Sequence, residues 1–213
     1  MSKTAHGTIF AVPLPDGTFV FGRVMLDVSK VLKRRLLPAD SPLPFCAGAY
    51  LVEMYSQITT NIDFVPSPLL IPGAFVELRE IGTTWPIVDQ VAVDPRKVEF
   101  PEYLIGFRHA KGDGAFVCGE IKYPVPFTLD DVLKGINVLG GWHSAFLWPY
   151  VCLWALGRRS EIPAEYKTAN LEDYDLRFSP HRARVYEHLP FSIAQSYFEK
   201  QAQLGLHVER LYE

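Results

Sequence analysis

The chain has 213 residues, and 21 Lys and Arg stand against 24 Asp and Glu, which gives a formal net charge of −3. Nucleic-acid binding needs clustered positive charge to neutralise phosphates, so this balance argues against that class of protein. Hydrophobic residues make up 48% and charged residues 21% of the chain, which is ordinary for a globular protein and excludes intrinsic disorder. A chain of this length can bury a core without disulfides or metals.

The apolar segments of the chain are too short for a signal peptide or a membrane span. Residues 9–12 form a brief apolar run near the N-terminus, which predicts a cytoplasmic protein. Residues 145–157 are the most apolar stretch, and their length predicts a buried core segment. Cys46, Cys118 and Cys152 lack the spacing of metal ligands, so we interpret them as small buried hydrophobic residues and expect neither a metal nor a cofactor.

Two hairpins are predicted by Asp-Gly pairs at residues 16–17 and 113–114, within β-rich segments that span residues 9–24 and 105–121. An Asp-Gly pair is typical of hairpin turns, because both turn positions of a two-residue loop favour a positive φ. The segments that begin at these pairs, DGTFVFGRV and DGAFVCGEI, share Asp, Gly, Phe, Val and Gly. Two explanations stay open: an internal duplication of about one hundred residues, or repeated use of the same hairpin chemistry.

Two further strands are expected at residues 50–55 and 73–81. Gly22 and Gly119 occupy equivalent positions in the two aligned hairpin segments. A glycine within a strand marks a bulge, a bend or a close backbone approach, and small barrels use such positions to turn corners.

Helices are expected to be few. Residues 128–139 predict one helix, with acidic side chains in its first turn, where they favour the helix dipole. Ser192 is expected to begin a second helix, which Gly205 would end. Residues 31–37, which follow Ser29, indicate a third and shorter helix.

These elements predict an α+β fold in which strands dominate, with a small-barrel-like antiparallel sheet and a few helices. We expect residues 1–213 to form one compact unit. Residues 7–100 would be a strand-rich half, and residues 101–213 a second half with a similar hairpin and a C-terminal helix.

Sequence motifs of common enzymes are missing from the chain. It contains no nucleophile elbow, phosphate-binding loop, dinucleotide-binding glycine pattern or HExxH motif. Their absence weakens the interpretation of the chain as an enzyme. Trp142, His143 and Ser144, which follow two glycines, come nearest to a catalytic cluster. One interpretation is a loop histidine with Trp142 anchored in the core. The other places His143 and Ser144 at the rim of a pocket between the two halves of a small-ligand-binding protein or hydrolase.

Acidic side chains gather in residues 161–175, where two tyrosines lie among them. Lys167 is the one basic residue of this segment, and a basic stretch follows it. The two stretches could pair with each other at the surface, where each pair contributes little. Alternatively the segment meets a basic partner, because complementary charge speeds association and aromatic side chains supply contact area.

Residues 7–24 read GTIFAVPLPDGTFVFGRV and are similar to the opening of the bacterial immunity protein 26 family. In that family a G-[DT]-[IV]-F-A-[IV]-P-L-P-D-G segment leads into an aromatic-rich strand that ends in G-R-V. The resemblance covers mainly residues 7–90, and the half of the chain that follows residue 101 does not match. It implies a strand-rich, non-catalytic protein of the bacterial cytoplasm that protects its cell by binding a cognate polymorphic toxin.

The family pattern assigns no contact residues, so these come from charge. Arg23 follows Gly22 in the shared opening and would either reach an acidic partner or pair internally. Because nuclease toxins are often basic, we select Glu165, Glu172, Asp173, Tyr174 and Asp175 of the acidic segment as toxin contacts. We add Arg23 as a contact that would reach an acidic group of the partner. The competing hypothesis of a ligand pocket or hydrolase selects Trp142, His143 and Ser144.

Overall fold

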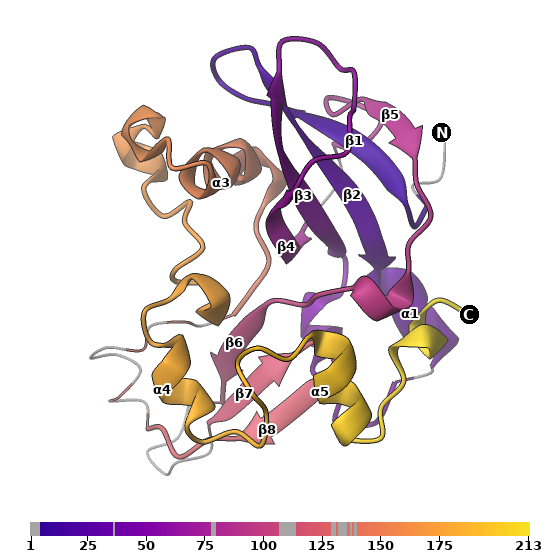
Figure 1. Cartoon of the computed structure of the whole chain (residues 1–213), viewed down its shortest axis with the longest axis vertical. Helices are drawn as coiled ribbons and strands as arrows, with labels where there is room; N and C mark the ends of the chain where they lie inside the picture. The colour runs from indigo at the N-terminus through magenta and orange to yellow at the C-terminus, as the bar shows by residue number, and fades with distance from the viewer. Residues whose placement is uncertain are drawn as a thin grey trace.

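The computed structural model contains two antiparallel sheets and a set of short helices (Figure 1). It describes residues 5–35, 37–77, 80–106, 114–128, 131, 136, 138 and 140–213. The larger sheet has the strand order β4-β3-β2-β1-β5, and its strands are β1 (Thr8–Pro13), β2 (Phe19–Asp27), β3 (Tyr50–Thr59), β4 (Leu69–Val76) and β5 (Ile87–Gln90). The smaller sheet has the order β6-β7-β8, and its strands are β6 (Glu102–Ile105), β7 (Ala115–Cys118) and β8 (Ile121–Pro124).

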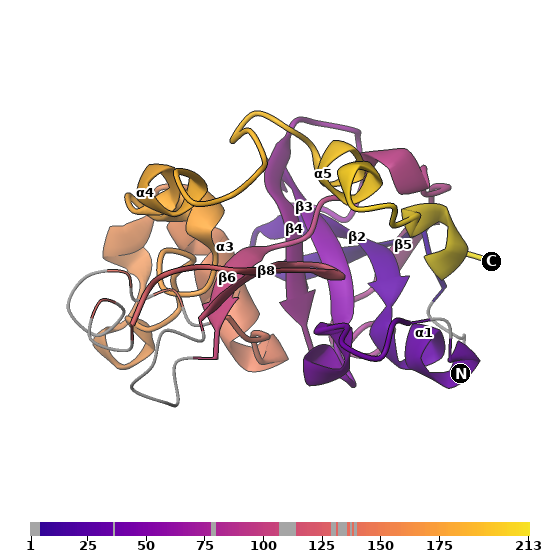
Figure 2. The same cartoon turned by 90° about the horizontal axis from the view of Figure 1, so that it is seen from below.

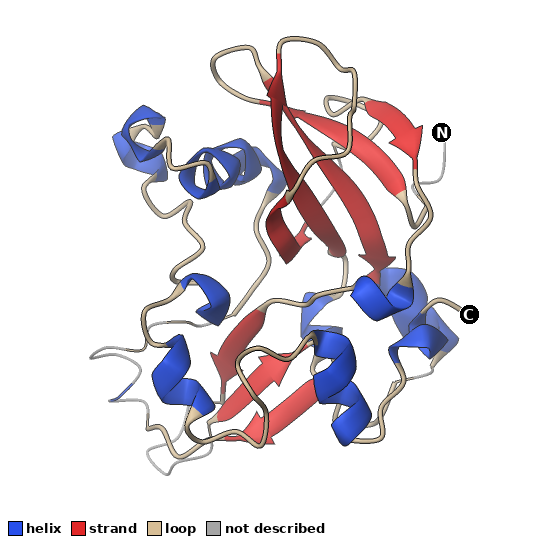
Figure 3. Cartoon of the chain, viewed as in Figure 1, coloured by secondary structure: helices blue, strands red, loops and turns tan. Residues whose placement is uncertain are grey.

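The helices gather mainly around the smaller sheet, as Figure 3 shows. In the described part of the chain they are α1 (Val28–Arg34), α3 (Trp148–Ala155), α4 (Arg182–Tyr186) and α5 (Tyr197–Gln203). Seen from below, α4 and α5 lie on one side of the small sheet (Figure 2). Tyr186 of α4 packs edge-on against Phe116 of β7, with ring centroids 5.8 Å apart. α3 instead packs beside the larger sheet.

The predicted α+β class is confirmed, whereas the prediction of a small-barrel-like sheet is wrong. Among the described residues neither sheet closes on itself, because closure of the larger one would need β4 to pair with β5. The free side of β4 is occupied by other parts of the chain. Val76 pairs with His143, and the carbonyl of Gly73 accepts a hydrogen bond from Arg177.

The first hairpin is confirmed, with a different turn from the one expected. Leu14 N donates to the carbonyl of Thr18 at 2.8 Å, so the turn enclosed by this hydrogen-bonded pair has three residues rather than two. Gly17 alone has a positive φ, of 82°. Asp16 Oδ1 accepts from both Thr18 N and Thr18 Oγ1 and thereby holds the turn. This is the three-residue hairpin with glycine at the left-handed position.

The two glycines aligned in the hairpins have different environments. Gly22 lies within β2, and a Cβ there would meet Cζ of Phe10 at 2.5 Å. Gly119 is not within a strand: it has φ +58° and lies in the turn between β7 and β8. The hairpins are therefore not equivalent beyond β7, which does not support an internal duplication. β6 and β7 do form an antiparallel pair, but the expected two-residue turn is wrong, because Ile105 pairs with Ala115 and nine residues, 106–114, join the two strands. Asp113 itself lies outside the described residues.

Capping residues explain where two helices begin. α1 begins after Asp27, whose Oδ1 accepts from Lys30 N at 3.1 Å, rather than after Ser29. α5 begins after Ser196 rather than Ser192, because Ser196 and Glu199 form a capping box. The helix expected over residues 128–139 lies mostly outside the described residues.

Three clusters of buried side chains form the core. The two larger clusters combine residues from before and after position 100, for example Phe10 with Trp148 and Leu26 with Leu176. The third cluster covers the opposite face of the larger sheet, where Phe64 packs against Phe21. All three cysteines are free and buried, as expected. None of the helices in the described part of the chain has the length and apolar character needed to cross a membrane.

Candidate functional site

The segment that follows α3 is built from short turns. Gly157, with φ +77°, ends α3, and Arg158 N donates to the carbonyl of Leu153 at 2.9 Å. Three 3-10 helices follow, at Arg159–Glu161, Ala164–Tyr166 and Leu176–Phe178. Their backbone hydrogen bonds are local, so side-chain contacts fix this segment against the rest of the molecule.

Aromatic contacts bring residues 142–150 against residues 166–174. The ring of Tyr150 stacks on that of Tyr166, with centroids 4.4 Å apart and planes inclined by 20°. Phe146 also contacts Tyr166, at 6.1 Å, and His143 lies 4.7 Å from Tyr174. The two candidate sites, which are separate in the sequence, therefore meet in the structure. We call the resulting face the acid–aromatic surface, and its residues are Trp142, Phe146, Glu165, Tyr166, Glu172, Asp173 and Tyr174.

Two large apolar side chains of this surface are exposed to solvent. Trp142 is 45% exposed and Phe146 is 63% exposed. The interpretation of Trp142 as a core anchor is therefore wrong. His143 pairs with Val76 of β4 in an extended conformation, and successive side chains of an extended segment point to opposite sides. His143 consequently points inward and Trp142 outward.

His143 is buried among aromatic rings. Its backbone N donates to the carbonyl of Phe75, its carbonyl accepts from Glu77 N, and its ring lies 5.3 Å from that of Trp148. Burial lowers the pKa of His143 to about 4, so the imidazole is neutral at pH 7. Across the described residues no carboxylate or hydroxyl hydrogen-bonds to this ring. Ser144, half-buried, precedes a short 3-10 helix. This arrangement is typical of a packed histidine and does not pair a base with a nucleophile.

The acidic residues selected from the sequence divide into surface and interior groups. Glu165 and Asp173 are exposed, and Asp173 Oδ2 accepts from Asn170 Nδ2 at 2.9 Å. Glu172 pairs with Arg159 at 3.2 Å while both side chains stay about half exposed. Asp175 lies in the interior, 2% exposed.

Asp175 organises the chain where it is buried. Its carboxylate pairs with Arg177 at 2.6 Å and accepts a hydrogen bond from Glu102 N at 3.2 Å. It also accepts from Arg177 N and so begins a 3-10 helix. A carboxylate used in this way is not available to a partner, so Asp175 does not belong to the acid–aromatic surface.

Arg23 forms the internal pair rather than an exposed contact. Its NH2 lies 2.8 Å from Oε1 of Glu53, which is buried, and its NH1 donates to the carbonyl of Ala92 at 3.2 Å. Tyr55 donates to the same Glu53 oxygen at 2.6 Å. Arg23 therefore contributes to the interior of the larger sheet, away from the acid–aromatic surface.

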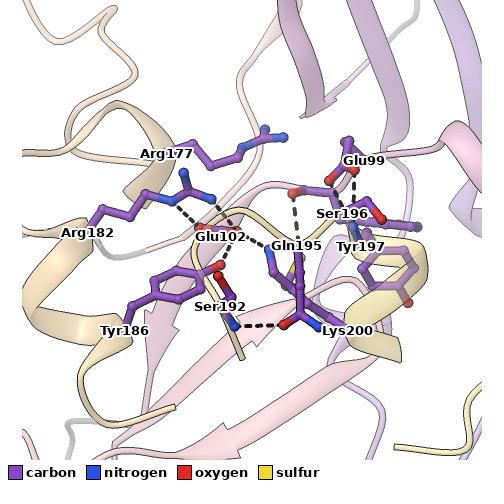
Figure 4. Close-up of polar contacts among 12 residues, drawn as sticks. Glu99, Glu102, Arg177, Arg182, Tyr186, Ser192, Gln195, Ser196, Tyr197 and Lys200 are labelled. Carbon is purple, nitrogen blue, oxygen red and sulfur yellow. Dashed lines mark hydrogen bonds and ion pairs between the residues drawn. The ribbon is translucent and has the colours of Figure 1, made fainter. Parts of the chain in front are cut away.

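A second polar cluster lies around Glu102 on β6 (Figure 4). Glu102 Oε1 accepts from Lys200 Nζ at 2.7 Å and from the Tyr186 hydroxyl at 2.5 Å. Arg182 donates to both carboxylate oxygens, at 2.8 and 3.0 Å. Burial acts to raise the pKa of Glu102, but the hydrogen bond from Arg182 and the charge of Lys200 outweigh it, and the pKa is lowered. This fully paired carboxylate holds α4 and α5 to β6 and presents no free reactive group.

Sequence reasoning missed both Phe146 and the Glu102 cluster. Phe146 lies in the most apolar stretch of the chain, which indicates burial. Glu102 did carry a usable signal, because an acid that begins the apolar strand EYLI needs a buried cation. The partners of that acid lie 80 to 98 residues further along the chain, so no local pattern identifies them.

Comparison with known proteins gives one match. No curated protein and no solved structure matches this chain. The family model of immunity protein 26 matches residues 5–114, which is about half of the chain and extends beyond the resemblance seen in residues 7–90. The matched part contains the larger sheet and β6, whereas the acid–aromatic surface lies after it. The chain belongs to the immunity protein 26 family.

Proposed function

We propose that this protein neutralises a cognate toxin by forming a stoichiometric complex with it through the acid–aromatic surface. Membership of the family implies a toxin-neutralising role and suggests a non-enzymatic one.

One observation carries the choice of surface: a segment with exposed aromatic side chains and a segment with exposed acids pack against each other through aromatic contacts. Trp142 and Phe146 are solvent-exposed, while the neighbouring Trp148 and His143 are buried. Aromatic anchors surrounded by polar groups are the usual anatomy of an energetic hot spot in a protein interface. Tyr166 is already stacked on Tyr150, so less rotamer freedom is lost when a partner binds.

The charge of the surface selects a basic partner. Glu165, Glu172 and Asp173 are all at least partly exposed, and Lys167 is the one basic residue between positions 160 and 175. Complementary charge raises association rates and suppresses wrong partners, even where individual ion pairs contribute little affinity. A toxin domain that binds a polyanionic substrate would present such a basic face.

The first experiment is capture of the partner with a tagged form of the protein from its native host, with identification by mass. A single stoichiometric partner that carries a toxin domain supports the proposal. A bound metabolite without a protein partner contradicts the proposal and favours the alternative of a ligand pocket at His143 and Ser144.

The surface itself is tested by charge reversal and aromatic truncation. Glu165→Lys with Asp173→Lys should abolish protection of cells that express the toxin, while the melting temperature stays unchanged, because both acids are exposed and the Arg159–Glu172 pair is left intact. Phe146→Ala should weaken toxin binding about 30-fold, as truncation of a hot-spot residue does. The matched control is Asp40→Lys with Glu187→Lys, which reverses two exposed acids outside the surface. Full protection by the first double variant would show that the toxin binds elsewhere.

A further inference from the structure

Arg158 connects two parts of the molecule that are 142 residues apart in sequence. Its NH2 lies 2.6 Å from Oδ2 of Asp16, in the turn between β1 and β2. Its Nε donates to Oε1 of Glu161 at 2.7 Å, and its NH2 also pairs with the second oxygen of that carboxylate. One guanidinium thus holds a carboxylate of the family-matched part and a carboxylate that leads into the acid–aromatic surface. We call this arrangement the Arg158 bridge.

Both ends of the Arg158 bridge are held in place by other contacts. Asp16 uses Oδ1 to accept from Thr18, at 3.0 Å from N and 2.7 Å from Oγ1, which leaves Oδ2 directed at Arg158. On the other side, the left-handed Gly157 turns the chain sharply at the end of α3. The Arg158 bridge therefore joins the β1–β2 turn to the segment that follows α3.

Arg159 makes a second connection of this kind, within the acid–aromatic surface. The guanidinium of Arg159 lies 4.3 Å from the ring centroid of Trp154 on α3 and pairs with Glu172 at 3.2 Å. Arg158 and Arg159 thus hold the acidic segment at its beginning and near its end. Between these points the segment makes local hydrogen bonds, such as Tyr166 N to the carbonyl of Pro163 and Ala169 N to that of Tyr166.

We propose that Arg158 is a positioning residue for toxin recognition, which fixes the acid–aromatic surface in its binding geometry by tying it to the β1–β2 turn. This inference rests on the proposed function. Exposed ion pairs add little to global stability, so the bridge acts on local order rather than on folding. A segment that is ordered before the partner arrives loses less entropy on binding and therefore binds more tightly.

The test compares Arg158→Gln, Asp16→Asn and the double variant in the intact chain. Hydrogen exchange of residues 161–175 in the free protein should rise about two- to fivefold in each single variant, with the melting temperature nearly unchanged. Affinity for the captured toxin domain, made as an inactive variant, should fall about two- to fivefold, the range that an exposed ion pair can supply through preorganisation. The double variant should match Arg158→Gln, because that single variant already removes the Arg158–Asp16 pair together with the Glu161 pair. Arg158→Lys should recover part of the loss, since its single ammonium can still reach Asp16.

Arg96→Gln is the matched control, because Arg96 makes an exposed ion pair with Glu209 at 3.7 Å outside the acid–aromatic surface. It should change neither exchange of residues 161–175 nor affinity. Unchanged exchange in Arg158→Gln, or additive losses in the double variant, would overturn the role of Arg158. The proposed function fails separately, if Glu165→Lys with Asp173→Lys, which leaves the contacts of Arg158 and Arg159 in place, does not change toxin binding.

Discussion

Lys200 Nζ lies 2.7 Å from Oε1 of Glu102, and each side chain is 1% exposed. A buried ion pair of this kind contributes little relative to apolar residues of the same volume, but removal of one partner leaves an uncompensated charge in the interior. Arg182 and Tyr186 complete the set of donors around Glu102. The cluster is therefore sensitive to single substitutions.

Replacement of the buried lysine should destabilise the protein. Lys200→Met keeps the volume but removes the cation, and we expect the free energy of unfolding to fall by about 3 kcal/mol. Urea denaturation at pH 7 measures this. Lys122→Met is the control, because Lys122 on β8 is exposed. A loss below about 1 kcal/mol would mean that Arg182 alone neutralises Glu102.

Acidification should destabilise the protein through His143. Its pKa is about 4 in the folded state, because of burial, against about 6.5 in the unfolded chain. As the pH falls from 6.5, the unfolded chain binds a proton that the folded protein rejects, so stability declines until about pH 4. The expected loss is about 3 kcal/mol between pH 7 and pH 4. Urea denaturation across this range should show a flatter profile for His143→Phe than for the parent, while His207→Gln, at an exposed histidine, should keep the parent profile.

The glycine within β2 should not tolerate a methyl group. In Gly22→Ala the new Cβ would lie 2.5 Å from Cζ of Phe10 and 2.6 Å from Sδ of Met54, closer than van der Waals contact allows. We expect a loss of about 2 kcal/mol, because a packed core must shift to admit the methyl group. Thermal unfolding tests this against Gly141→Ala, where no atom lies within 4 Å of the new Cβ. Equal melting temperatures for the two variants would contradict the close approach.

The capping box of α5 should be detectable by a pair of matched substitutions. Ser196 Oγ accepts from Glu199 N at 3.3 Å, and Glu199 Oε2 accepts from Ser196 N at 2.8 Å. Ser196→Ala should therefore lower the free energy of unfolding by about 1 kcal/mol. Ser192→Ala should have a smaller effect, since Ser192 Oγ accepts only from Ala194 N, within a turn. A larger effect at Ser192 would place the functional start of the helix earlier.

Local signals in the sequence predicted the local structure well. The Asp-Gly pair at residues 16–17 located the first hairpin, and the resemblance in residues 7–24 identified the family that the chain belongs to. β5, β6 and β8 have four residues each, too few for alternation to be visible, and the expected strands do not cover them beyond one terminal residue. β7 is equally short, and the Asp-Gly pair that precedes it located it. The start of α5 was expected at Ser192, whereas the helix begins after Ser196. Gln195 and Glu199 follow the two serines at the same spacing, and both residue types suit a capping box, so the local pattern does not distinguish the two starts.

The arrangement of the site could not be predicted, because it depends on contacts between distant residues. The sequence located the acids of residues 165–175 and the cluster of Trp142 and His143, but not their proximity. That proximity follows from aromatic packing between α3 and the turns after it. Exposure of Trp142 is likewise set by the pairing of His143 with β4, which no property of tryptophan indicates.

The family-matched segment ends at residue 114, between β6 and β7. A boundary there divides a hairpin and separates Glu102 from Arg182, Tyr186 and Lys200. The family-matched segment and this polar cluster therefore have different limits. Loss of the carboxylate at position 102 would leave Lys200 buried without its counter-charge, so a chain that lacks this carboxylate would need a second change beyond the boundary.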